Sequence, residues 1–418
     1  MVMAPILGLL TWSSHTATND NVMSRLAAIQ SLAEHHTFQI DNTDFVRAID
    51  KVYVGGHFYS DKPPTPSVLG AALYWPMYAA GLSFHSQPRI VVFVLTFGLL
   101  GFSFLACLAC FHDALARMGL SGGNALWMTT MLALGTLYMA FTTTFNNHTL
   151  AASWIFIGFY GILRANHDPR PRWMWLAGCG FALAVTSEYV TTLFLAGFVV
   201  CALARSSLRR RILGLIVPVV LAVGAVMIYN VAISGSLRPI PVRPDLFRYP
   251  GSHYLTKGAG EFLPGSGYNT PSFALHYGLG LLFGENGFLL YCPILLVAIW
   301  EAGKRIVLRQ PLWVEAATTL AVTVVFVVYY AFATNSYGGC SYSIRYFVSF
   351  TPLLWFFAFP AFLGRRWKHL LLAALFAVSF WPALLGCVNP WTCGKPSFFV
   401  NLHRWYLRYH VDGTILEF

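Results

Sequence analysis

The chain has 418 residues, of which 57% are hydrophobic and only 10% are charged. Soluble globular proteins carry about 25% charged residues, so this composition excludes an ordinary soluble domain and predicts a polytopic membrane protein. The formal net charge is +11. It does not indicate nucleic-acid binding, because the cations cluster in short loops between apolar segments, as they do in membrane proteins.

Apolar segments recur along the whole chain, and we expect an all-α polytopic membrane protein with about eleven transmembrane helices in a single domain over residues 1–418. The expected spans lie near residues 1–12, 90–110, 125–145, 149–164, 173–187, 189–204, 212–233, 287–302, 312–333, 346–363 and 369–387. The first is shorter than the roughly 20 residues that a span needs. We therefore expect either that the recorded start truncates this helix or that residues upstream are missing.

Basic residues gather in four short loops that fall on the same side of the membrane. These loops contain Arg164, Arg170 and Arg172; Arg205, Arg209, Arg210 and Arg211; Lys304, Arg305 and Arg309; and Arg365, Arg366 and Lys368. The positive-inside rule assigns this side to the cytoplasm. The opposite side receives a first outer loop at 13–89, a large outer loop at 234–286 and a tail at 388–418. We therefore expect a plasma or inner membrane protein whose functional side faces the periplasm or the exterior.

The apolar segment 67–84 contains Pro76 and is long enough to be considered as a further span. We expect instead a helix that lies in the outer interface, because the turn at 85–89 would be very short between two spans. Tyr74, Trp75 and Tyr78 also suit the headgroup region of the bilayer.

The first outer loop opens with the stretch TNDNVMSRLAAIQSLAEHH, which predicts an amphipathic helix over about 21–36. Its apolar face consists of Val22, Leu26, Ile29 and Ala33. Asp20 stands at the start of this helix. It is either an N-cap that accepts backbone N–H groups or a carboxylate held at the membrane surface as a general base, and the two roles are compatible.

The stretch HFYSDKPPTP places Asp61 and Lys62 directly before Pro63, Pro64 and Pro66. Prolines fix the backbone and limit the freedom of the segment, which suits a binding site better than a spacer. Lys62 is either an interfacial side chain that pairs with Asp61 or an ammonium that faces a phosphate.

A third outer segment, TNSYGGCSYSIRYF, joins two expected spans and contains Arg345. Gly338 and Gly339 permit a tight turn whose N–H groups can face an anion. Arg345 lies where the next helix begins, at a depth where a cation usually has a partner. It either anchors the helix end at the headgroups or makes a bidentate contact with a phosphate.

Two short outer turns carry further polar residues. Asn146, Asn147 and His148 form one turn, and Glu188 lies in the other. A lone His or Glu at such a position is more often structural than catalytic. These residues become candidates because they share the outer side of the membrane with Asp20, Lys62 and Arg345.

Taken in order, these stretches resemble GT-C membrane glycosyltransferases, and most closely the protein O-mannosyltransferases and the aminoarabinose transferase of lipid A. The resemblance is carried by ND…SRLAAIQSLAEHHTFQID, GHFYSDKPP, FNNHTLAA, GENGFLLYCP and SYGGCSYSIRYFVSFTPLL, from residue 18 to about residue 355. It implies a GT-C-like helical bundle with interfacial helices in the first outer loop.

The resemblance also implies a reaction. A polyprenyl-phosphate sugar would enter from the membrane, and a hydroxyl acceptor (a glycan, a lipid or a protein) would attack the anomeric carbon with inversion. Carried over by motif, Asp20 is the base, Lys62 and Arg345 hold the donor phosphate, and Arg25 matches the helix arginine that follows the acid. The supporting candidates are Asp61, His148, Glu188 and Tyr342.

The chain departs from the family pattern at the base. Many relatives carry two acids there, whereas Asn19 and Asn21 flank a single Asp20 in this sequence. Some members of the wider class use a divalent metal, but no second carboxylate is clearly placed to bind one. We therefore expect no metal and no other cofactor.

Two alternatives remain from the sequence. A multispan lipid or solute transporter fits the many spans, although the charges cluster on one face and no inverted repeat is visible. A non-catalytic membrane scaffold is the other. In addition, Cys340 and Cys393 lie on the same expected side of the membrane and are candidates for a disulfide bond.

Overall fold

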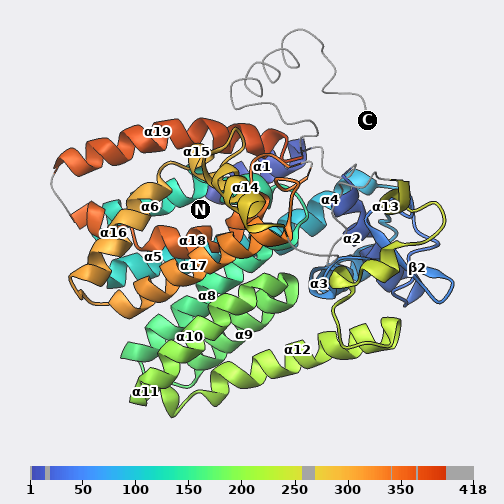
Figure 1. The fold of residues 1–418 in the computed structure, drawn as a ribbon, viewed down its shortest axis with the longest axis horizontal. Coiled ribbons are helices and arrows are strands. Elements are labelled where there is room, and N and C mark those ends of the chain that lie inside the picture. The colour runs from blue at the N-terminus through green and yellow to red at the C-terminus, as the bar shows by residue number, and fades with distance from the viewer. Residues whose placement is uncertain (1, 15–18, 257–268, 340, 364–365, 392–418) are drawn as a thin grey trace, which may run out of the picture.

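The computed structural model describes residues 2–14, 19–256, 269–339, 341–363 and 366–391. Within these residues nearly all regular structure is helical, as expected, and the helices form an elongated bundle (Figure 1). A smaller group of elements, which includes α2, α3, α13 and β2, lies at one end of this bundle on the right of the view. Cys340 and Cys393 both lie outside the described residues.

The N-terminal part of the chain contains one helix, the small outer group and a long helix. The elements are α1 (Met3–Ser13), α2 (Asp20–Gln30), the π-helical turn η1 (Ser31–His35), β1 (Lys51–Val54), β2 (His57–Ser60), α3 (Pro64–Ala79), α4 (Pro88–Leu95), the π-helical segment η2 (Thr96–Gly101) and α5 (Phe102–Arg117). The last three form one continuous helix of 30 residues.

The middle of the chain supplies most of the bundle. Its elements are α6 (Gly122–Leu134), α7 (Leu137–Thr142), α8 (Asn147–His167), α9 (Arg172–Ser187), η3 (Tyr189–Thr191), α10 (Thr192–Ala204), α11 (Ser206–Arg209), α12 (Leu213–Ser234), η4 (Ile240–Val242), η5 (Pro244–Phe247) and α13 (His253–Thr256). The expected span 125–145 is therefore two helices, separated at Gly135 and Thr136.

The C-terminal part contains α14 (Pro271–Phe283), α15 (Phe288–Tyr291), α16 (Leu295–Val307), α17 (Trp313–Ala333), η6 (Arg345–Phe350), α18 (Thr351–Phe356), η7 (Phe359–Leu363) and α19 (Arg366–Val388). Helix α14 lies inside the segment 234–286, where the sequence predicted only an outer loop. Its start is encoded locally, because the Thr270 side chain accepts the N–H of Phe273 and Pro271 occupies the first turn.

Five helices in the described part of the chain are long and apolar enough to cross a membrane: Pro88–Arg117, Leu213–Ser234, Trp313–Ala333, Arg345–Leu363 and Trp367–Val388. The pair Pro271–Tyr291 and Leu295–Val307, which is bent by 100°, would make a sixth. The chain is thus a multi-pass membrane protein, but the expected number of about eleven spans is not confirmed. Several expected spans are short or interrupted helices, which an apolar run alone does not reveal.

Helices α8 and α9 pack closely because glycines face each other between them. A Cβ atom on Gly180 would lie 2.7 Å from the backbone nitrogen of Gly158, and one on Gly161 would lie 2.7 Å from that of Ala177. Small residues allow membrane helices to approach in this way. Since the two helices are joined by a short connection, the beginning of α8 lies beside the end of α9, where Glu188 follows.

The predicted apolar face of the first outer helix is confirmed. Val22, Leu26, Ile29 and Ala33 are all buried in one cluster, together with residues of α3, α4 and η2. Helix α3 begins at Pro64, so the proline-rich stretch forms the start of a helix. Tyr74 was expected among the lipid headgroups, but it is buried against this cluster, and its hydroxyl group donates to Glu34 Oε1 at 2.5 Å.

Candidate active site

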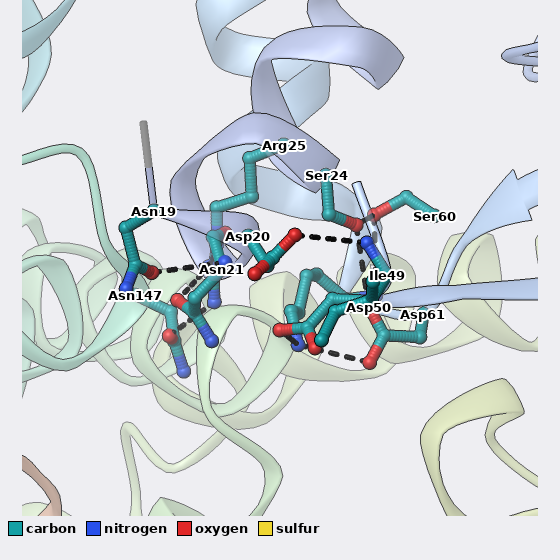
Figure 2. A network of polar contacts seen from close by, with 11 residues as sticks. Asn19, Asp20, Asn21, Ser24, Arg25, Ile49, Asp50, Ser60, Asp61 and Asn147 are labelled. Carbon is teal, nitrogen blue, oxygen red and sulfur yellow. Dashed lines mark hydrogen bonds and ion pairs between the residues drawn. The ribbon is translucent and has the colours of Figure 1, made fainter. Parts of the chain in front are cut away.

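Asp20 occupies the first turn of α2, where a carboxylate interacts favourably with the helix dipole. The N-cap role considered for Asp20 belongs to Asn19, whose side chain accepts the backbone N–H of Asn21 at 2.9 Å. Asp20 Oδ1 instead accepts the N–H of Ile49 at 2.9 Å, which joins the helix to the segment before β1. Figure 2 shows this contact at the centre of a polar cluster. The bond fixes the carboxylate without using Oδ2.

A β-hairpin brings two acids together beside Lys62. Strands β1 and β2 are antiparallel and connected by Gly55 and Gly56, which have φ angles of +59° and +94°. Such a two-residue connection requires positive φ angles, which glycine adopts readily. In this register Lys51 pairs with Ser60. Asp50 directly precedes β1 and Asp61 directly follows β2, so the two acids lie side by side.

Lys62 joins the two acids that the hairpin aligns. Its Nζ lies 2.7 Å from Asp50 Oδ2 and 2.9 Å from Asp61 Oδ2. Ser24 donates from α2 to Asp61 Oδ1 at 3.2 Å, and its Oγ lies 2.7 Å from that of Ser60. The pairing of Lys62 with Asp61 that the sequence left open is therefore present, and Asp50 is a second partner that the sequence analysis missed.

The pKa values of the two acids shift in opposite directions. For Asp50, burial favours the neutral form, but Lys62, Arg345 and Arg25 outweigh this effect and hold the pKa below its ordinary value. For Asp61, burial dominates over the attraction of Lys62, and the negative charge of Asp50 adds to it, so the pKa is raised. Asp50 is therefore the stronger ion-pair partner of Lys62.

Arg25 lies under the same cluster and is 1% exposed. Its Nη1 donates to the backbone oxygen of Asn21 at 2.6 Å and also to the Asn21 side chain, and its Nη2 donates to Asn147 Oδ1. Burial is the largest cause that lowers its pKa, to about 10, and the nearby charge of Arg345 acts in the same direction. Its Nε is buried without a hydrogen-bond partner in the described residues.

Glu188 and His148 meet on the other side of Asn147. His148 Nδ1 lies 2.6 Å from Glu188 Oε2, which also accepts a hydrogen bond from Asn147 Nδ2. The hydroxyl group of Tyr330 donates to Glu188 Oε1 at 2.8 Å. The structure thus joins Arg25, His148 and Glu188 in one buried network that begins at α2 and reaches α17.

Arg345 begins η6 and faces aromatic rings. Its guanidinium carbon lies 5.4 Å from the ring centre of Tyr346 and 5.1 Å from that of Trp391. Its Nε is buried, and within the described chain it has no hydrogen-bond partner. Since the charge of Arg345 affects the pKa values of both Arg25 and Asp50, it belongs to the same electrostatic cluster.

Tyr342 takes a different position from the other candidates. It is buried, its backbone N–H donates to the oxygen of Pro390 at 2.9 Å, and its ring packs against that of Tyr291 with 5.1 Å between the centres. These contacts lie in the helical core. The structure therefore gathers Asp20, Arg25, Asp61, Lys62, His148, Glu188 and Arg345, but it does not bring Tyr342 to them.

In the part of the chain that the structure describes, no group of three or more His, Cys, Asp and Glu side chains is arranged to hold a metal ion. Asp50 and Asp61 are instead bound to an ammonium group, which competes with a cation for the same oxygens.

No family model and no curated protein sequence matches the chain. Its structure is similar to that of ArnT from Cupriavidus metallidurans bound to undecaprenyl phosphate, with a TM-score of 0.56 and 14% identity over 93% of this chain and 75% of that one. It is also similar to the oligosaccharyltransferase of Archaeoglobus fulgidus in the apo form (TM-score 0.53, 13% identity, 98% of this chain and 58% of that chain).

The complex of the archaeal oligosaccharyltransferase AglB from the same organism with an inhibitory peptide and a dolichol-phosphate gives a TM-score of 0.52 and 13% identity, over 99% of this chain and 59% of that one. The chain therefore spans less than two thirds of the length of the archaeal proteins. At such low identity the similarity establishes the fold. The chain has the fold of the GT-C membrane glycosyltransferases, as the sequence resemblance predicted.

Proposed function

We propose that the protein is an inverting glycosyltransferase that moves a sugar from a polyprenyl-phosphate donor to a hydroxyl acceptor on the outer face of the membrane. The observation that carries the proposal is the pair of arginines in the cluster. Arg25 and Arg345 each keep a buried Nε–H group without a partner in the described residues. Buried donors of this kind are costly, and a ligand that accepts hydrogen bonds would satisfy them.

The charges of the cluster suit a phosphate better than a carboxylate or a neutral group. Lys62 uses two of the three donors of its ammonium group on Asp50 and Asp61, so one remains for a ligand. Two guanidinium groups and one ammonium group can together hold a lipid phosphate at the interface. The similar structures contain undecaprenyl phosphate and dolichol-phosphate, which supports this choice of donor.

The proposed reaction is a single displacement. Asp20 accepts the proton of the acceptor hydroxyl group, whose oxygen forms a bond to the anomeric carbon as the bond from that carbon to the phosphate oxygen breaks. The phosphate leaves with the bonding electrons, and the cations stabilise its added negative charge. The bond from Ile49 to Asp20 Oδ1 supports the role of base, because it orients the carboxylate while Oδ2 remains available.

A transfer assay with the purified protein tests this function. Undecaprenyl-phosphate sugars labelled on the sugar would be offered with hydroxyl acceptors, and release of undecaprenyl phosphate and labelling of the acceptor would be measured. We expect turnover of at least one donor by the wild type and not by Asp20→Asn. Movement of donors across vesicle membranes without turnover would favour a transporter instead.

A further inference from the structure

Glu188 is a buried carboxylate that the reaction described above does not use. It follows the last residue of α9, and its backbone is held at both ends: its N–H donates to the oxygen of Ala184 at 2.9 Å, and its own oxygen accepts from Thr191 Oγ1 at 2.7 Å. The residue is 6% exposed. Because burying a carboxylate is costly, its neighbours must compensate for the lost hydration.

Among the residues that the structure describes, three side chains contact the carboxylate, and none of them is a lysine or an arginine. They are Asn147 and His148 on Oε2 and Tyr330 on Oε1. The nearest guanidinium along this network is that of Arg25, which the Asn147 amide separates from Glu188. These contacts join residues that are 122, 41 and 142 positions apart in the chain, so they tie α2, α8, the end of α9 and α17 together.

The two groups that contact the Asn147 amide, Glu188 and Arg25, determine its orientation. An ionised Glu188 can only accept hydrogen bonds, and Arg25 can only donate them. The amide nitrogen must therefore face Glu188 and the amide oxygen must face Arg25. Without the carboxylate both orientations of the amide become accessible, and one of them presents N–H groups to the guanidinium.

Buried donors without a partner are uncommon in native proteins, and each one needs an explanation. Arg25 Nε is such a donor, because it has no partner in the described residues although the side chain is almost completely buried. The other guanidinium nitrogens are fixed by Asn21 and Asn147. The unpaired N–H is thus held in one direction and left for a ligand.

We propose that Glu188 is a positioning residue that, through Asn147, sets the guanidinium group of Arg25 to receive the phosphate of the lipid donor. This inference rests on the proposed function and adds to it a residue that does not touch the donor. It also explains why a carboxylate is present at the end of α9, where a polar residue without charge would cap the same turn.

Binding of undecaprenyl phosphate to the purified full-length protein tests the inference without relying on turnover. We expect Glu188→Gln to raise the Kd about tenfold, the effect of a charge-assisted contact of about 1.4 kcal/mol. Asn147→Ala should raise it similarly. The double variant should bind undecaprenyl phosphate no more weakly than either single variant, because both changes break the same connection.

Tyr330→Phe is the matched control, because it removes a hydrogen bond from the other oxygen of the same carboxylate. It should change the thermal unfolding temperature but the Kd by less than about twofold. An equal loss of binding in Tyr330→Phe, or wild-type binding in a folded Glu188→Gln, would overturn the inference and leave the proposed function intact. If Glu188→Gln does not fold, Asn147→Ala decides the matter, since Asn146 caps α8 independently.

No binding of undecaprenyl phosphate by the wild type would be a failure of the proposed function itself. The pH dependence of donor affinity gives a second readout. If Glu188 acts through Asn147, Glu188→Gln should lower donor affinity by the same factor between about pH 6 and pH 8, because Arg25 stays charged throughout this range with its pKa near 10. A loss of affinity relative to the wild type that is confined to one end of the range would instead assign the effect to a titrating group, either His148 or the phosphate of the probe, and would contradict the inference.

Discussion

The charged residues at the two ends of the bundle are organised differently. At the end with the arginine-rich loops, two ion pairs join neighbouring helices: Lys368 Nζ lies 3.0 Å from Glu301 Oε1, and Arg205 Nη1 lies 2.5 Å from Glu315 Oε1. A third pair lies within α5, where Arg117 Nε is 2.6 Å from Asp113 Oδ2. At the other end Lys62 lies between two acids, and the structure gives neither Arg25 nor Arg345 an acidic partner within its described residues.

The difference distinguishes charges that stabilise helix packing from charges that are available to bind a ligand. At the arginine-rich end the cations that pair with an acid on the next helix stabilise the packing, although Arg305 there also has a buried Nε without a hydrogen-bond partner in the described residues. In the outer cluster Arg25 and Arg345 keep buried N–H groups without a partner in the described residues, and the pKa values of Asp50 and Asp61 shift in opposite directions. A cluster of this kind is costly for a protein to maintain, which is why perturbed groups gather at functional sites.

The strongest test of this comparison is Asp20→Asn. The substitution preserves an oxygen for the N–H of Ile49 but removes the proton acceptor. We expect kcat to fall by about 10²–10⁴-fold with little change in the Kd for undecaprenyl phosphate. The transfer assay and a binding titration would measure the two effects. A transfer rate near that of the wild type would remove Asp20 from the mechanism.

Removing a phosphate-binding cation should have the next largest effect. We expect Arg345→Ala to lower kcat by about 10²–10³-fold and also to weaken donor binding, because it loses charge that stabilises the leaving group. Arg345→Lys should recover part of the loss. Equal activities of Arg345→Ala and the wild type would show that Arg345 only anchors the start of η6.

The two acids beside Lys62 should respond differently to neutralisation. Asp50→Asn should lower the free energy of unfolding by about 1–3 kcal/mol at pH 7, since it removes a favourable ion pair. Asp61→Asn should have no effect or a stabilising one, because burial already disfavours the charged form of Asp61. Thermal unfolding in detergent would compare the variants, and a greater loss for Asp61→Asn would reverse our assignment.

The pH dependence of stability in these variants follows from the directions in which folding shifts the pKa values of Asp50 and Asp61. The pKa of Asp50 is lowered by folding, so its stabilising contribution is present above the unfolded value of about 3.9 and is lost as the pH falls through the folded pKa. The pKa of Asp61 is raised, so its contribution is present at low pH and is lost as the pH rises through the folded pKa. We expect Asp61→Asn to flatten the loss of stability on raising the pH, and Asp50→Asn to flatten the loss on acidification.

The smallest effect is expected at the opposite end of the bundle. Arg117 and Asp113 are both more than two fifths exposed, and exposed pairs contribute about 0–1 kcal/mol. Arg117→Ala should leave the rate of transfer within about twofold of the wild type and change the unfolding temperature only slightly. A large loss of transfer in this variant would show that the two ends are coupled, and the contrast drawn above would not hold.

Much of the helical structure could be predicted from local patterns. The spacing of Val22, Leu26, Ile29 and Ala33 is enough to identify an amphipathic helix and its buried face, and the apolar runs locate most of the long helices. The breaks within these runs could not be found in the same way. Helices α6 and α7 separate at Gly135 and Thr136, and hydropathy does not distinguish such a break from a continuous span.

Asp50 was missed although a signal for it exists in the sequence. The two glycines at 55 and 56 lie between the short runs KVYV and HFYS, which is a pattern typical of a two-residue hairpin. Extending that pairing by one residue brings Asp50 opposite Asp61. The sequence analysis predicted an all-α chain and did not consider a hairpin, because each strand is only four residues long.

The sequence by itself determined the membrane class, the helical architecture, the resemblance to a fold and most of the residues that meet in the cluster. These depend on composition, on periodicity and on short motifs, which act over a few residues. Only the tertiary structure decided which distant polar groups meet, such as Arg25 with Asn147. Contacts across more than a hundred residues depend on how closely helices such as α8 and α9 pack, and no local pattern encodes that distance.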